Sequence, residues 1–143
     1  LIMREEEREM FGLLADQGVG SIPFSPLAKG RVCRPWGERT ARMDVDPVGR
    51  RYDQDVDRPI VEAVQRIAEA RGIPMAQVAL AWCIHKPAIT SVIFGARSPE
   101  QLDDNLKAAT LELSPAIVQR LDEASAFPLG YPYEFMRNIQ GRW

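Results

Sequence analysis

The chain has 143 residues and a formal net charge of −2, from 18 Lys and Arg against 20 Asp and Glu. With 45% hydrophobic and 27% charged residues, its composition is that of a globular protein and argues against a disordered chain. The near-neutral charge argues against a general nucleic-acid binder, and no apolar run approaches the roughly 20 residues that cross a membrane. We therefore expect one globular domain, with no nucleic-acid partner and no membrane span.

The first residue and the cysteines give two further expectations. The chain opens on Leu1 without an initiator methionine or a signal peptide, so we expect it to be a piece of a longer protein. Cys33 and Cys83 form neither a Cys-x-x-Cys motif nor a disulfide framework. No metal site is predicted, and the cytoplasm is the expected location.

Apolar residues recur at helical spacing in four segments. They predict helices over residues 5–17, 59–71, 75–85 and 116–124. Gly18 and Gly72 are expected to end the first two of these helices. Ser98, followed three residues later by Gln101, predicts a capped helix that starts at Pro99.

Two short apolar runs, residues 19–24 and 89–94, predict strands that are buried on both faces. Their order among the helices is that of a βαβ unit, so we predict an α/β fold with a parallel sheet over residues 1–126, followed by a tail at 127–143. Two such strands need further strands around them, from absent sequence or from other chains. Their open edges would allow self-association.

Two loops are candidate sites because each follows a predicted strand. Gly95, Arg97 and Ser98 lie where a strand leads into a helix N-terminus, whose N–H groups and dipole favour an anion. Gln101 and Asn105 lie on one face of that helix, and their amide groups suit the edge of a purine. The ordinary alternative is a capped surface helix with an exposed arginine, which the helix signals taken alone favour.

The second loop, residues 24–30, places the hydroxyl of Ser25 and the cation of Lys29 at the end of the first predicted strand. Its ordinary alternative is a simple turn. Because parallel strands end at the same edge of a sheet, both loops are expected to open on one face, as the phosphate site of a (β/α)8 barrel does. The segment 29–57 has no regular period and is predicted to be a lid-like loop.

Three motifs make the interpretation more specific. Ser25-Pro26-Leu27-Ala28 with Gly30, the segment 76–82, and Gly95-Ala96-Arg97 with Gln101-Leu102 and Asn105 together resemble the C-terminal part of the aldo-keto reductases. The resemblance runs over residues 4–121 and implies an α/β fold that is a partial (β/α)8 TIM barrel, the last two strands with their helices. It also implies an oxidoreductase that binds NADP(H) and reduces aldehydes or ketones, with a small-molecule carbonyl substrate in the intact parent.

The resemblance assigns roles in cofactor binding by position. Phe24 would pack near the nicotinamide, and Ser25, Leu27 and Lys29 would line the pyrophosphate path. The long loop at 29–57 would fold over the cofactor like a belt. Within this loop, Arg34 or Arg39 would reach the phosphates.

The other end of the cofactor falls on the second loop. Gly95, Arg97 and Gln101 would hold the 2′-phosphate and adenosine, and an arginine at position 97 favours NADP over NAD. Asp104 and Asn105 would contact the adenine. The complete implied set of cofactor-binding residues is Phe24, Ser25, Pro26, Leu27, Lys29, Gly95, Arg97, Gln101, Asp104 and Asn105.

The resemblance leaves catalysis outside this chain. The family's Asp, Tyr, Lys and His set lies on earlier strands that are absent here, so we assign no catalytic residue and expect the chain alone to be inactive. His85, the only histidine, is expected to cap helix carbonyls instead. The alternative function is a non-enzymatic nucleotide-sensing or interaction subunit of the same fold.

Overall fold

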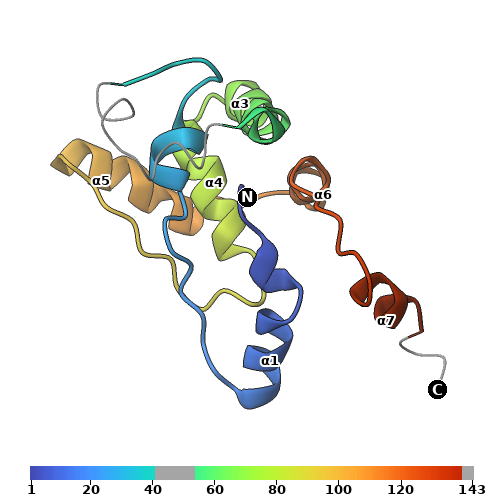
Figure 1. Ribbon diagram of the computed structural model, residues 1–143. Coiled ribbons are helices and arrows are strands. Elements are labelled where there is room, and N and C mark those ends of the chain that lie inside the picture. Colours follow the sequence, from blue (N-terminus) through green and yellow to red (C-terminus); the bar gives the residue numbers. More distant parts are fainter. Residues whose placement is uncertain (41–53, 140–143) are drawn as a thin grey trace.

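The computed structural model describes residues 1–40 and 54–139, and in this part of the chain every regular element is a helix (Figure 1). None of these helices is both long enough and apolar enough to cross a membrane. The elements in chain order, with η marking a 3-10 helix, are η1 (Glu5–Glu7), α1 (Met10–Gln17), η2 (Ala28–Cys33), η4 (Asp55–Asp57), α3 (Arg58–Arg71), α4 (Met75–Ile84), α5 (Pro99–Leu106), η5 (Lys107–Thr110), α6 (Pro115–Ala124) and α7 (Tyr133–Ile139).

The helix ends predicted from glycine and serine are confirmed. Gly18 after α1 and Gly72 after α3 have φ angles of 64° and 62°, a left-handed conformation that glycine adopts without steric cost. The Ser98 hydroxyl accepts a hydrogen bond from the Gln101 N–H at 3.2 Å and caps α5. Two details differ: the first α-helix begins only at Met10, after the short η1 turn, and the tail contains the unpredicted helix α7.

The hydrophobic core lies around α3, which packs against both α4 and α6. Val61 and Val64 of α3, Val78 of α4 and Leu121 of α6 have no exposed surface. The helix α4 is buried on nearly all sides, as its almost continuous apolar sequence predicts. Because η2 packs on α3 and α4 as well, the loop that carries the first candidate site is attached to this core.

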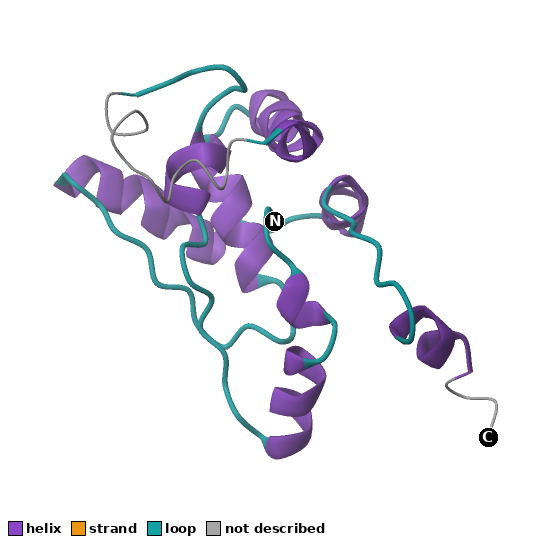
Figure 2. Cartoon of the chain, viewed as in Figure 1, coloured by secondary structure: helices purple, strands orange, loops and turns teal. Residues whose placement is uncertain are grey.

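The predicted strands do not form. Within residues 1–40 and 54–139 the structure has no strand and no sheet (Figure 2), so the predicted α/β fold, a partial (β/α)8 TIM barrel, is wrong for this chain. Residues 19–24 and 89–94 do lie side by side: the Thr90 N–H donates to the Ser21 carbonyl at 2.9 Å, and the Ser21 N–H donates to the Thr90 hydroxyl at 2.9 Å. A β-ladder needs such backbone bonds to repeat along both segments, and Pro23 has no N–H to contribute.

These two segments are also far more exposed than the predicted buried strands. Val19, Ile22 and Ile93 have exposed fractions of 55%, 57% and 65%. An apolar run predicts burial only where another element covers it, and within the described residues no helix covers these three side chains. Both segments therefore lead into the candidate loops along an open surface.

Candidate functional site

A pocket of about 540 Å³ lies between the loop that follows residue 24 and the segment that leads into α5. It brings together two parts of the chain that are about seventy residues apart in the sequence. Eight of the ten residues predicted to bind a cofactor line it: Phe24, Ser25, Pro26, Leu27, Lys29, Gly95, Arg97 and Gln101. The volume is within the usual range for small-molecule sites.

The first wall of the pocket has an unusual backbone. Ser25, Ala28 and Lys29 have φ angles of 51°, 46° and 53°, in the left-handed region that residues with a Cβ adopt only at a cost of roughly 1–3 kcal/mol each. Such conformations persist where surrounding structure holds them, and they are concentrated at ligand sites. Here the loop continues into η2, which packs on the core.

Three consecutive backbone N–H groups of this loop, those of residues 28–30, are used within the loop itself. The Ala28 N–H donates to the Ser25 carbonyl at 2.8 Å, the Gly30 N–H to the Leu27 carbonyl at 2.8 Å, and the Lys29 N–H to the Ser25 hydroxyl at 3.1 Å. A phosphate-binding loop usually offers such N–H groups to its ligand. In this pocket, recognition of an anion therefore falls mainly to side chains.

Cations dominate the polar side chains of the pocket. Lys29, Arg31, Arg34 and Arg97 line it, whereas no Asp or Glu occurs among the described residues of its wall. Gly30 leaves room for one of these cations, because a Cβ at that position would lie 3.3 Å from the guanidinium nitrogens of Arg34. A concave wall of one sign of charge concentrates ligands of the opposite sign.

The second wall is the capped start of α5. While Ser98 caps the helix, the side-chain oxygen of Gln101 accepts the Arg97 N–H at 2.8 Å. This bond fixes the turn from which the Arg97 side chain extends, and Arg97 is exposed. Gln101 thus lines the pocket, with its side-chain oxygen occupied by the turn.

Asp104 and Asn105, the two residues predicted for the adenine, do not line this pocket. Asp104 is exposed and forms an ion pair with Lys107 at 2.7 Å. Asn105 is only 4% exposed and lines a separate hollow of about 300 Å³ beside residues 89–94. Its amide nitrogen is buried there, and no described residue forms a hydrogen bond with it.

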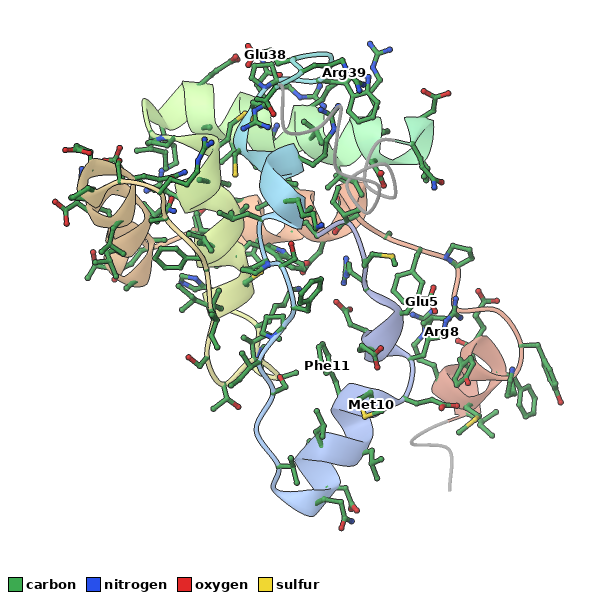
Figure 3. All side chains as sticks on the ribbon, turned by 60° about the vertical axis from the view of Figure 1, so that its left-hand side comes forward. Glu5, Arg8, Met10, Phe11, Glu38 and Arg39 are labelled. Atoms are coloured by element: carbon green, nitrogen blue, oxygen red, sulfur yellow. The ribbon has the colours of Figure 1, made fainter. Side chains whose placement is uncertain are left out.

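The predicted long loop is described only in part. Of the two arginines expected to reach the phosphates, Arg34 lines the pocket, whereas Arg39 is exposed at the edge of the molecule beside Glu38 (Figure 3). The remaining part of the predicted belt, residues 41–53, lies outside the described residues.

The histidine and tyrosines that the structure describes lie away from this pocket. The Nδ1 atom of His85 is 2.7 Å from the carbonyl oxygen of Ala81, which confirms the predicted contact with a helix carbonyl. The Tyr133 hydroxyl donates to Glu9, and Tyr131 is exposed in the tail. Tyr52 lies outside the described residues.

A second, mainly apolar hollow of about 510 Å³ adjoins the first. The two share four lining residues: Phe24, Ser25, Pro26 and Ala28. Met10, Phe11 and Trp82 contribute apolar surface to the second hollow, and Figure 3 shows Met10 and Phe11 on α1. Phe24, with 84% of its surface exposed, therefore stands at the junction of a cationic pocket and an apolar one.

Comparison with known proteins identifies the family to which these features belong. The sequence profile of the Aldo/keto reductase family matches residues 1–126. The chain belongs to the aldo/keto reductase family.

Related aldo-keto reductases are found in fungi. The chain is 35% identical over 128 residues to versiconal hemiacetal acetate reductase of Aspergillus parasiticus, an alignment that covers 86% of this chain and 37% of that protein. It is 39% identical over 125 residues to aldo-keto reductase AMT2 of Alternaria alternata, covering 86% of this chain and 34% of the relative. It is 41% identical over 128 residues to aldo-keto reductase dtxS3 of Metarhizium robertsii, again covering 86% and 34%. The chain spans about a third of the length of these curated relatives.

Two residues of this aldo-keto reductase pocket, and a tryptophan that packs behind one of them, were not predicted from the sequence. Arg31 and Cys33 line the wall, and Trp36 packs on the Arg31 guanidinium at 3.9 Å from ring centroid to Cζ. Burial raises the pKa of the Cys33 thiol to about 11, which keeps this thiol protonated at neutral pH. The Arg-x4-Trp spacing was the available signal for the Arg31–Trp36 pair, but the surrounding run of arginines conceals it.

Proposed function

We propose that this chain is the NADP(H)-binding part of an aldo-keto reductase that reduces aldehydes or ketones. The observation that carries the proposal is the charge of the pocket, which has four cations and no carboxylate among its described lining residues. NADP combines a pyrophosphate with a 2′-phosphate, and arginine and lysine are the side chains that bind such groups best. Family membership supports a nicotinamide dinucleotide as the anion concerned.

Different residues of the pocket would contact successive parts of an extended dinucleotide. Ser25, Leu27 and Lys29 would follow the pyrophosphate, with Arg34 beside them. Arg97 would bind the 2′-phosphate, because it lines the pocket at the turn that begins α5 and its guanidinium suits a phosphate. Phe24 would contact the nicotinamide, which then faces the apolar hollow.

The chemistry of the cofactor, when bound, is the transfer of a hydride to the carbonyl carbon of the substrate. The role of this chain is to hold and orient the dinucleotide, because no Tyr, His, Asp or Glu occurs among the described residues of the cationic wall to act as proton donor. Glu6 and Glu7 line only the adjoining hollow, where Glu7 is paired with Arg4 at 2.7 Å, and the family's proton donor is assigned to other sequence. The chain alone should therefore bind the cofactor without turnover. The substrate class is a small carbonyl compound, and the name of one relative, a versiconal hemiacetal acetate reductase, extends this class to hemiacetals through the free aldehyde with which a hemiacetal is in equilibrium.

The same pocket wall supports a second candidate function. A protein that binds a dinucleotide through cations but provides no proton donor could sense the nucleotide rather than use it. The two functions differ in the behaviour of a longer protein that contains this chain, which would turn over NADPH with an aldehyde in one case and only bind it in the other.

Titration of the chain with NADPH, followed by the fluorescence of the reduced nicotinamide, tests the proposal. We expect saturable binding, weaker binding of NADH, and no loss of absorbance at the nicotinamide band when a simple aldehyde is added. A fluorescence change that does not saturate with either nucleotide would contradict the proposed binding role. Turnover by the chain alone would contradict the expectation that the catalytic residues lie outside this chain.

A further inference from the structure

Arg31 is the most deeply buried cation of the pocket wall. Only 3% of its surface is exposed, although it lines the pocket. The Cζ atom of its guanidinium lies over the Trp36 ring, 3.9 Å from the ring centroid. Stacking of this kind is worth about 0.5–2 kcal/mol and restricts the guanidinium to one orientation.

The pair is anchored on both sides. Val32, the next residue, is 1% exposed and belongs to the hydrophobic core, and Trp36 is half-buried against the same core. Because η2 packs on α3 and α4, the backbone that carries Arg31 is held by the two best-packed helices of the protein. A charge held in this way is already in position before a ligand arrives, so binding requires little further ordering.

The rest of the loop makes this charge necessary. The N–H groups of Ala28, Lys29 and Gly30 are bonded within the loop, so they do not present the cradle that phosphate loops commonly offer. A lysine carries its charge at the end of a flexible stem, whereas the guanidinium of Arg31 lies against Trp36 and is always protonated. Within a poorly solvated wall, a fixed charge acts on a nearby anion more strongly than the same charge in water.

We propose that Arg31, held in place by Trp36, is an electrostatic anchor for the pyrophosphate of the bound dinucleotide, separate in role from Arg97. This inference rests on the proposed function, because it names a further determinant of binding at the same site. Arg31 belongs to the loop that would follow the pyrophosphate, which NADPH and NADH share. Arg97 belongs to the turn that would meet the 2′-phosphate, which only NADPH has.

The two arginines therefore predict different specificity patterns. Replacing Arg31 by methionine should raise the Kd of NADPH and of NADH by the same factor, on the order of tenfold or more at low salt. Arg97→Met should raise the Kd of NADPH alone. Arg31→Lys and Trp36→Leu should each weaken the binding of NADPH and NADH by the same, intermediate factor. Arg31→Lys keeps the charge but loses the guanidinium that packs on Trp36, and Trp36→Leu keeps the arginine but removes the ring that holds it.

The experiment compares these variants with the wild type by calorimetry, using NADPH and NADH, at about 50 mM and 500 mM salt. At the higher salt concentration, screening should reduce the factor by which Arg31→Met weakens nucleotide binding. A purely structural defect would weaken binding by the same factor at both salt concentrations. Arg120→Met, at an exposed position on α6, is the matched control and should bind both nucleotides as the wild type does. Thermal unfolding of each variant checks that it is folded.

A second measurement uses only the wild-type chain and so does not depend on the folding of variants. In ¹⁵N spectra of the arginine side chains, inorganic pyrophosphate and NADPH should each shift the Nε–H signal of Arg31. The inference would be overturned if the Arg31 signal did not move. It would also be overturned if Arg31→Met bound both nucleotides within twofold of the wild type, or if it lost affinity for NADPH alone. A wild type that binds neither nucleotide would overturn the proposed function, and the inference with it.

Discussion

Trp82 on α4 donates its indole N–H to the carboxylate of Asp122 on α6 across 2.9 Å. The same carboxylate accepts from Lys86, whose ammonium lies 4.6 Å from the centroid of the Trp82 ring. Arg4 adds a third link, because it donates to the Asp122 carbonyl at 3.0 Å and to the Ser125 hydroxyl at 2.8 Å. The carboxylate of Asp122 thus joins α4 and Lys86 to α6, and Arg4 joins the first residues of the chain to α6 through the Asp122 carbonyl and Ser125.

Replacing Asp122 by alanine should lower the free energy of unfolding by about 1–3 kcal/mol, because the buried indole N–H and the half-buried Lys86 lose their shared acceptor. Chemical denaturation monitored by tryptophan fluorescence measures the change. Asp103→Ala, at an exposed site on α5, is the control and should change stability little. Equal stabilities of the two variants would show that the Asp122 network does not stabilise the fold.

Two glycine-to-alanine substitutions should act in opposite directions. A Cβ at Gly20 would lie 2.8 Å from the Thr90 hydroxyl, which accepts the Ser21 N–H, so Gly20→Ala should separate the two extended segments and destabilise the protein by about 1–3 kcal/mol. A Cβ at Gly12, inside α1, meets nothing within 4 Å, so Gly12→Ala should stabilise by about 0.5–1 kcal/mol. Thermal unfolding measures both effects, and destabilisation of similar size in the two variants would contradict the described contact.

The thiol of Cys33 should react slowly at neutral pH. Burial raises its pKa to about 11, so the rate of alkylation by iodoacetamide should rise about tenfold per pH unit up to that range, whereas the urea-unfolded chain should follow an ordinary thiol near pH 8.5. Since the folded state holds the thiol proton more tightly, this group stabilises the fold below its ordinary pKa and loses that contribution as the pH rises toward 11. Peptide mass spectrometry measures the labelling, and a folded-state midpoint near pH 8.5 would contradict the described burial.

Arg8 fastens the tail to the start of the chain. It donates to the Pro128 carbonyl at 2.9 Å, lies 4.9 Å from the Phe127 ring centroid, and is paired with Glu5 at 2.7 Å, its neighbour in Figure 3. Arg8→Gln should release this segment and make chymotryptic cleavage near Phe127 several-fold faster. Arg120→Gln, exposed on α6, should leave the rate unchanged, and an equal rate in all three proteins would show that Arg8 does not restrain the tail.

Local signals in the sequence predicted most of the helices, although not α7 and not the late start of α1. Gly18, Gly72 and Ser98 act within one turn of chain, so their effect does not depend on what surrounds them. The strands could not be predicted in this way. A strand exists only through its neighbours, and the Ser21–Thr90 contact stays an isolated link because no repeated ladder accompanies it within the described residues.

In the candidate site, too, local features were predicted from the sequence and tertiary ones were not. Lys29 and Arg97 were predicted as lining residues because each lies at a recognisable loop, and the structure brings both into one pocket. Asn105 was expected beside them, but it lines a separate hollow. The sequence shows which face of helix α5 carries Asn105, but not which part of the protein lies against that face. Arg31 was missed because its importance comes from burial and from stacking on Trp36, which are tertiary properties.

The central claim is that two loops distant in sequence bind one phosphorylated dinucleotide, and backbone amide NMR of the labelled chain tests it most directly. Addition of NADPH should shift or protect amides in both residues 24–34 and 93–101, while the amides of α6 stay unchanged. NADH should leave the Arg97 region less affected than the loop at Lys29. Shifts confined to one loop, or spread evenly over the helices, would contradict the account.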